Sequence, residues 1–389
     1  MIPRSALPTL LRLARGFPVV ALTGPRQAGK TTLAQQAFGD KAYVSLENPE
    51  EREFAETDPK RFLARFADGA ILDEVQRCPQ LLSWLQGIVD ARKHMGDFVL
   101  TGSQQFELVS GMTQSLAGRV GRVELLALSA GELAAAERLP EQLDELLFQG
   151  AYPALYDRAL SPLDWFANYV ATYLERDVRQ LIAVRDLTQF QRFVRMCAAR
   201  SGQLLNLSAL GADCGITAVT AREWLSVLEA SYLVTRIPPY FENFGKRLVK
   251  TPKLYFLDVG LMCWLLGIRD AASIATHAMR GALFETWVVS EFIKTRFNDG
   301  RPADLYFWRD NVGQEVDLLF ETRDGLQAVE IKSGQTFASD WPAAALKWRT
   351  LSNSPLMPWI IHGGEGEYER QGCLAIGWRA FATRSSPAR

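Results

Sequence analysis

The chain has 389 residues, enough for two or three domains. Its 48% hydrophobic and 22% charged residues are typical of a globular protein and exclude a disordered or fibrous one. The formal net charge of −1 excludes a global attraction to nucleic acid, so a polyanion site would have to be a local patch. Five scattered cysteines without a Cys-x-x-Cys pair indicate buried thiols in a reducing compartment, and three distant histidines argue against a histidine metal centre.

The N-terminus lacks the basic segment and unbroken apolar core of a secretory signal. The most apolar later run, residues 254–268, carries Asp258 and is too short to span a bilayer. We therefore expect a cytoplasmic protein without a membrane partner.

Short apolar runs alternate with helix-like stretches through the first 140 residues. The runs are residues 17–23, 43–46, 70–72 and 98–101. This alternation predicts a parallel sheet with helices on both faces. We assign residues 1–140 to an α/β P-loop domain of this kind.

A phosphate-binding loop follows the first apolar run and precedes a helical pattern. Its residues are Gly24, Pro25, Arg26, Gln27, Ala28, Gly29, Lys30 and Thr31, followed by Thr32. Backbone amides of such a loop cradle phosphates at a helix N-terminus, and Lys30 would reach the β- and γ-phosphates. The Thr31 hydroxyl would bind Mg²⁺, so the pattern predicts ATP and Mg²⁺ as cofactors.

Two acids end the apolar run at 70–72. Asp73 is suited to hold the Mg²⁺ shell and Glu74 to polarise the attacking water. Ser103 follows the next run and is our candidate to sense the γ-phosphate, the alternative being a plain turn residue. Arg119 and Arg122 are each either a surface arginine or the arginine that one subunit of a homo-oligomer supplies to its neighbour's phosphate.

Residues 141–240 have a helical pattern and contain a compact unit that matches a winged helix-turn-helix. Its expected helices are 190–199, 208–212 and 217–230, the last capped by Thr217, and an extended segment follows at 232–237. The arginines at 179–200 give a local positive charge beside this unit. The candidate DNA-binding residues are Arg179, Arg192, Arg195, Thr220 and Arg222. The alternative is that the winged helix binds a protein and that the arginines pair with neighbouring acids.

Residues 241–389 begin a third domain, in which a helix at 284–297 precedes strand-like runs at 305–309, 315–320 and 326–331. A hairpin would bring Asp317 beside Glu330 and Lys332, and Glu285 on the helix can point to the same place. Three acids with a lysine can hold Mg²⁺ and activate water, which resembles the Asp…Glu-x-Lys pattern of restriction-like nucleases. The alternative is a salt-bridge cluster in a degenerate nuclease fold that serves for binding.

The motifs together resemble the prokaryotic AAA-type ATPases that carry a DUF4143 C-terminal region. The resemblance rests on Gly-Pro-Arg-Gln-Ala-Gly-Lys-Thr-Thr, Leu-Asp-Glu-Val-Gln, Leu-Thr-Gly-Ser, Leu-Ala-Gly-Arg and the later Glu330-Ile-Lys332-Ser-Gly. It covers nearly the whole chain and implies an ASCE-type ATPase joined to a winged helix and an α/β restriction-endonuclease-like domain. One departure is that no second sensor arginine is evident in a small helical lid, so the resemblance does not imply a hexameric motor.

Three functions fit these patterns. The first is a Mg²⁺-dependent ATP hydrolase that acts on DNA or is regulated by it, including branched or recombining DNA. The second is an ATP-dependent regulatory switch that binds protein partners, similar to toxin–antitoxin systems. The third is an ATP-regulated, metal-dependent endonuclease.

Overall fold

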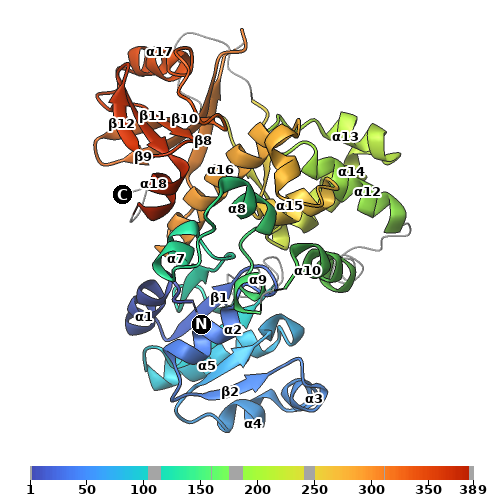
Figure 1. The fold of residues 1–389 in the computed structure, drawn as a ribbon. Coiled ribbons are helices and arrows are strands. Elements are labelled where there is room, and N and C mark those ends of the chain that lie inside the picture. The colour runs from blue at the N-terminus through green and yellow to red at the C-terminus, as the bar shows by residue number, and fades with distance from the viewer. Residues whose placement is uncertain are drawn as a thin grey trace.

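A computed structural model describes residues 2–103, 115–158, 160–174, 187–240, 250–310 and 312–384. Figure 1 shows the N-terminal sheet in blue at the bottom, the helices α12–α14 in green at the right, and the C-terminal sheet in orange and red at the upper left. The helices α8 and α16 lie between these parts. Among the described residues, no helix is both long and apolar enough to cross a membrane.

The N-terminal sheet has five parallel strands in the order β2-β3-β4-β1-β5. The strands are β1 (Val19–Thr23), β2 (Ala42–Ser45), β3 (Ala70–Asp73), β4 (Phe98–Gly102) and β5 (Val120–Glu124). The strands β1, β3 and β4 are buried along their whole length, which explains their continuous apolar sequences. The strand β4 lies between β1, which leads into the phosphate-binding loop, and β3, which ends at Asp73.

Helices cover both faces of this sheet. One face packs against α1 (Leu7–Gly16) and α2 (Lys30–Ala37). The other face packs against α3 (Pro49–Thr57), α4 (Pro59–Ala64) and α5 (Leu81–Arg92), and the short 3₁₀ helix η1 (Val75–Arg77) follows β3. The predicted parallel sheet with helices on both faces is therefore confirmed.

A helical region follows the sheet. Its first helices are α7 (Ala130–Ala135), α8 (Leu143–Gln149), α9 (Pro153–Asp157), α10 (Pro162–Tyr169) and the π-helical η2 (Val170–Leu174). Next come α12 (Leu187–Ala198), α13 (Leu207–Cys214) and α14 (Ala218–Ala230), and then the antiparallel pair of β6 (Val234–Ile237) and β7 (Lys253–Phe256). Three helices and a strand pair form the predicted winged-helix arrangement. Thr217 caps α14 as expected, since its side chain accepts a hydrogen bond from the Thr220 amide.

The C-terminal region is a mixed six-stranded sheet in the order β12-β13-β11-β10-β9-β8. Its strands are β8 (Leu305–Arg309), β9 (Glu315–Thr322), β10 (Gly325–Lys332), β11 (Trp359–His362), β12 (Glu367–Arg370) and β13 (Cys373–Gly377). Its helices are α15 (Val259–Leu265), η3 (Ala272–Thr276), α16 (Arg280–Asn298), α17 (Ala343–Ser352) and α18 (Trp378–Thr383). The α16 helix packs on the sheet through Phe292, whose ring centroid is 5.2 Å from that of Phe320.

The predicted β9–β10 hairpin is present, with Thr322 opposite Gly325. The strands β5, β11, β12 and β13 are not among the runs predicted from the sequence. All five cysteines are buried free thiols, as predicted.

Candidate functional site

The loop of residues 24–31 connects β1 to α2, and its shape requires glycine at both ends. A Cβ atom at Gly24 would collide with the carbonyl oxygen of Leu125, and Gly29 has a φ of 90° at the N-cap of α2. Gln27 also has a positive φ, of 62°. The loop therefore has the left-handed turns of a phosphate-binding nest, followed by Thr31 and Thr32 in the first turn of α2.

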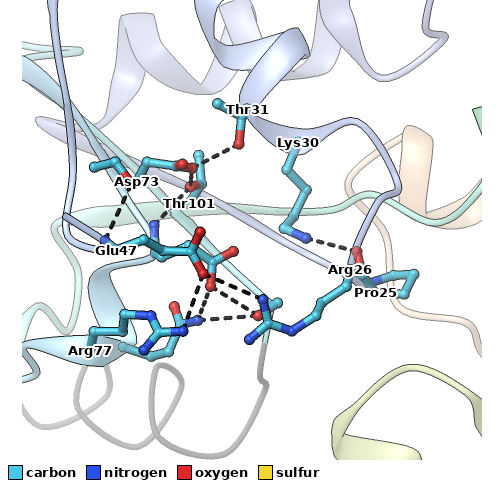
Figure 2. Close-up of polar contacts among 12 residues, drawn as sticks. Pro25, Arg26, Lys30, Thr31, Glu47, Asp73, Arg77 and Thr101 are labelled. Carbon is cyan, nitrogen blue, oxygen red and sulfur yellow. Dashed lines mark hydrogen bonds and ion pairs between the residues drawn. The ribbon is translucent and has the colours of Figure 1, made fainter. Parts of the chain in front are cut away.

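Lys30 is buried and its side chain bends back over the loop. Its ammonium group donates hydrogen bonds to the carbonyl oxygens of Gly24, at 3.0 Å, and Pro25, at 2.7 Å. Figure 2 shows Lys30 turned toward Pro25. The positive charge of Lys30 thus lies beside the first two residues of the loop.

Asp73 lies at the end of β3 and joins four elements. Its carboxylate accepts hydrogen bonds from the hydroxyls of Thr31, at 2.8 Å, and Thr101 (Figure 2). It also accepts a hydrogen bond from the hydroxyl of Tyr43, at 2.9 Å. Burial and the neighbouring Asp73 raise the pKa of Tyr43 to about 12, so Tyr43 remains a donor at neutral pH. A hydroxyl and a carboxylate oxygen 2.8 Å apart beside a phosphate-binding loop are hard ligands of the kind that Mg²⁺ shares with a nucleotide.

Glu74 follows Asp73 in a left-handed conformation, with a φ of 56°. This conformation is costly for a residue with a side chain, and such strain is typical of functional sites. In this conformation the Glu74 carboxylate accepts hydrogen bonds from the Ser103 hydroxyl, at 3.1 Å, and from the Gln76 side-chain amide. Ser103 and Gln76 also contact each other at 3.1 Å, so two polar groups hold the carboxylate.

Two arginines share one acid beside the loop. A carboxylate oxygen of Glu47 lies 3.7 Å from the guanidinium of Arg26 and 3.1 Å from that of Arg77. Figure 2 shows Glu47 between these two side chains. Glu47, Gln76 and Arg77 were not predicted as site residues. The neighbouring Leu-Asp-Glu-Val-Gln motif contains Gln76 and is the one signal that could have indicated it.

Arg4 supports the loop through a backbone carbonyl group and was also not predicted as a site residue. Its guanidinium donates to the carbonyl oxygens of Ala28, at 2.6 Å, and Leu126, at 2.7 Å, and forms a buried ion pair with Glu132 at 3.1 Å. Glu132 also closes the capping box of α7 with Ser129. No sequence motif marks Arg4, because its partners are distant along the chain.

A tyrosine from the winged-helix unit reaches the C-terminal end of β1. The Tyr232 hydroxyl donates to the Thr23 hydroxyl at 2.8 Å and lies 3.4 Å from the carboxylate of Glu124. Thr23 directly precedes the phosphate-binding loop. The structure thus connects this loop to the winged helix through one buried side chain.

The two arginines for which the sequence left open a surface role or a role in a neighbouring subunit are engaged within the chain. Arg119 forms a two-pronged ion pair with Asp90 on α5, at 2.6 and 2.8 Å, and Arg122 pairs with Glu124 at 2.7 Å. The first pair lowers the pKa of Asp90. Either arginine would have to leave its partner to act on a nucleotide in another subunit.

The predicted carboxylates of the C-terminal region are divided between two lysines. Lys253 pairs with Glu285 at 3.0 Å and with Glu315, whereas Lys332 pairs with Glu330 at 2.8 Å and with Asp317 at 3.4 Å. Within the described part of the chain, no three His, Cys, Asp or Glu side chains form a group that could hold a metal ion. Glu285, Asp317 and Glu330 therefore do not form the three-carboxylate cluster expected from the sequence.

Burial dominates the electrostatics of this network. Burial first, and the nearby Asp317 second, raise the pKa of Glu330 well above its ordinary value. Burial also raises the pKa of Glu285, against the opposing effect of Lys253. One oxygen of Glu330 is buried and has no hydrogen-bond partner among the residues that the structure describes.

The predicted DNA-binding residues lie on the surface of the winged-helix unit, except that Arg179 falls outside the described residues. Arg192 and Arg195 are exposed on α12, and Arg222 is exposed on α14. Thr220 contacts the capping Thr217, with the hydroxyls 2.9 Å apart. Over the described residues, no acidic side chain forms an ion pair with Arg192, Arg195 or Arg222.

Three family models match the chain. They are an AAA domain over residues 16–134, a domain of unknown function, DUF8612, over residues 140–272, and the domain of unknown function DUF4143 over residues 280–381. An uncharacterized protein of Mycobacterium tuberculosis is 33% identical over 338 residues, which cover 86% of this chain and 74% of that protein. An uncharacterized protein of Mycobacterium bovis matches to the same extent.

The chain is also similar to two solved structures over part of its length. The Walker-type ATPase of Pyrococcus abyssi is 14% identical with a TM-score of 0.46, over 68% of this chain and 96% of that chain. The RuvB Holliday junction branch migration motor of Thermotoga maritima is 21% identical with a TM-score of 0.30, over 60% of this chain and 87% of that chain.

Proposed function

We propose that this chain, which belongs to the family of AAA-type P-loop ATPases with a DUF4143 C-terminal domain, hydrolyses ATP at the loop of residues 24–31. The observation that carries the proposal is that three groups lie together at the C-terminal ends of the parallel strands. These are the phosphate-binding loop, the Thr31–Asp73 pair and the Glu74 carboxylate held by Ser103 and Gln76.

The residues have distinct roles in this proposal. The loop amides and Lys30 bind the β- and γ-phosphates, and Thr31 and Asp73 hold Mg²⁺. When bound, Mg²⁺ neutralises charge on the phosphate oxygens. Glu74 orients the attacking water and accepts its proton, and its hydrogen bonds to Ser103 and Gln76 set the direction of the carboxylate. Mutation of Lys30 and Glu74 tests this proposal and is argued in the Discussion.

We also propose DNA as the partner of the winged-helix unit. The support is the pair of exposed arginines Arg192 and Arg195, which form no ion pair within the described ranges, lie one turn apart on α12 and can reach successive phosphates.

Replacement of Arg192 and Arg195 with glutamine should weaken DNA binding about equally for all sequences. Each lost phosphate contact makes the slope of log K against log salt less negative by about 0.9 for duplex DNA, so the expected change is about 1.8. Fluorescence anisotropy at several salt concentrations measures this slope for single-stranded, duplex and four-way DNA.

The matched control is the double variant Arg61→Gln/Arg158→Gln, which removes two exposed arginines elsewhere on the molecule. It should leave the slope unchanged. If both double variants bind DNA with the affinity and slope of the unmodified protein, the winged helix is better explained as the protein-binding part of a regulatory switch.

A metal-dependent endonuclease is the alternative activity that the Asp…Glu-x-Lys pattern of Asp317, Glu330 and Lys332 suggests, although among the described residues these acids form no three-carboxylate metal group with Glu285. Lys332→Met leaves two carboxylates without their cation, so it should lower the free energy of unfolding by about 1–3 kcal/mol. This is less than the cost of breaking a fully buried pair, because a third of the Lys332 side chain is exposed. Urea unfolding measures the change, with the exposed Lys60→Met as the control.

The same variant separates the two interpretations of the C-terminal region. Nicking of supercoiled or four-way DNA in Mn²⁺ that both Lys332→Met and Asp317→Asn abolish, with ATP hydrolysis retained, would identify an endonuclease. A loss of stability without nicking by the unmodified protein would leave a structural or binding role for this network.

A further inference from the structure

A large cavity that no residue of the phosphate-binding loop lines lies between α1, the C-terminal end of α16 and the β9–β10 hairpin. Its volume is about 1150 Å³, and its lining includes four arginines, Arg12, Arg296, Arg301 and Arg323. Three acids, Asp299, Glu321 and Asp324, also line it, so the charged lining has one more positive than negative group. The cavity is large enough for a small organic ligand.

Arg296 is the buried member of this set, with 7% of its surface exposed. One terminal nitrogen donates to the backbone carbonyl of Glu321 at 3.4 Å, and the buried Nε–H has no hydrogen-bond partner in the described part of the chain. The guanidinium lies 5.9 Å from the centre of the Phe320 ring. Over the described residues, no carboxylate forms an ion pair with Arg296.

A buried guanidinium without an ion pair is costly, because the protein interior does not replace its hydration. Burial lowers the pKa of Arg296, and the more distant Asp304 and Glu321 only partly oppose this effect. An anion in the cavity would supply the missing charge and an acceptor for the Nε–H.

The other three arginines are exposed around the same space. Arg12 donates to the backbone carbonyl of Asp299 at 3.3 Å, which joins α1 to the end of α16. Arg301 follows α16, and Arg323 lies in the turn of the hairpin. Among the described residues, none of the three forms an ion pair. The guanidinium groups of these three arginines, which lie on three different segments, can therefore contact one ligand together.

The guanidinium fork matches phosphate oxygens with two parallel hydrogen bonds. The carboxylates of Glu321 and Asp324 would repel a polyacidic peptide, but they can accept hydrogen bonds from the hydroxyl or amino groups of a nucleotide. We propose that this cavity is a second binding site, separate from the loop of residues 24–31, for a ligand with a phosphate monoester on a sugar or nucleoside, and that Arg296 contacts its phosphate. The ligand is either a free nucleotide or the phosphorylated end of a nucleic-acid strand.

Calorimetry on the full chain carrying Lys30→Ala, which disables the loop of residues 24–31, tests the site. The probes are uridine 5′-monophosphate, a thymidine tetranucleotide with a 5′-phosphate, the same tetranucleotide with a 5′-hydroxyl, and a pentaglutamate peptide. We expect at least one phosphorylated probe to bind and the 5′-hydroxyl form to bind much more weakly. Binding of the monophosphate identifies a free nucleotide as the ligand, and binding of the phosphorylated tetranucleotide alone identifies a strand end.

Arg296→Gln should weaken the bound probe at least about tenfold, since a charge-assisted hydrogen bond is lost. Because Arg296 is buried and its loss can unfold the chain, the exposed pair Arg301→Ser/Arg323→Ser provides the second variant and should have a similar effect. The matched control Arg61→Ser should bind normally. The proposal is wrong if no phosphorylated probe binds, if only pentaglutamate binds, or if the bound probe retains its affinity in the folded Arg296 variant or in the double variant.

Discussion

Glu74→Gln should lower kcat for ATP hydrolysis by about 10²–10⁴-fold, the range for loss of a general base, while ATP still binds. The amide keeps the size of the side chain but cannot take a proton from water. Lys30→Ala should reduce both binding and turnover, because the ammonium that lies over Gly24 and Pro25 would no longer reach the phosphates. Both variants are therefore expected to lose turnover, but only Lys30→Ala is expected to lose affinity for ATP.

Phosphate release measures turnover, and the affinity for a fluorescent ATP analogue measures binding. Glu53→Gln and Lys60→Ala are the matched controls, since both side chains are exposed on the α3–α4 segment. Normal turnover in Glu74→Gln or in Lys30→Ala would refute the assignment of this site.

A second feature of the Glu74 variant would distinguish its role from a structural one. The glutamine can keep its contact with the Ser103 hydroxyl, which lies 3.1 Å from the carboxylate. We therefore expect the thermal midpoint without nucleotide to remain near that of the unmodified protein. A large fall in this midpoint would mean that the loss of activity follows from unfolding.

The sequence predicts the N-terminal sheet well because its central strands are fully buried. Their apolar runs are continuous, and the glycine-rich loop fixes which strand leads into α2. The strand β5 was missed because it is at the edge of the sheet. Its residues alternate between buried and exposed, and Gly121 and Arg122 make its sequence resemble a loop.

The candidate site was predictable only where a local motif carries it. Lys30, Thr31, Asp73 and Glu74 lie in such motifs. Glu47 and Arg77, in contrast, become neighbours through the parallel pairing of β2 with β3, and no spacing in the sequence encodes that pairing.

The C-terminal carboxylates illustrate the same limit. The hairpin that places Asp317 near Lys332 could be predicted from the turn at 321–325. The pairing of Glu285 with Lys253 could not be predicted, because Lys253 enters from the wing strand β7.

Arg4→Met should lower the free energy of unfolding by about 3–5 kcal/mol, the cost of breaking a buried ion pair. The substitution keeps an apolar side chain of similar length but leaves the buried Glu132 carboxylate without its cation. It also removes the donor to the Ala28 carbonyl, which lies in the phosphate-binding loop. We therefore expect a second effect, a smaller rise of the melting temperature on adding ATP than the unmodified protein shows.

Urea unfolding followed by tryptophan fluorescence measures the first effect of Arg4→Met, and melting curves with and without ATP measure the second. Arg138→Met is the matched control, because Arg138 is exposed just after α7 and its loss should cost less than about 0.5 kcal/mol. Adding Glu132→Gln to Arg4→Met should restore part of the lost stability, since the amide is neutral and its oxygen can still accept from the backbone amide of Ser5 or of Ser129. The response to ATP should stay reduced in this double variant, because the Ala28 carbonyl still lacks its donor. Recovery of both properties would mean that Arg4 acts only through Glu132, and a normal response to ATP in Arg4→Met would mean that Arg4 does not support the loop.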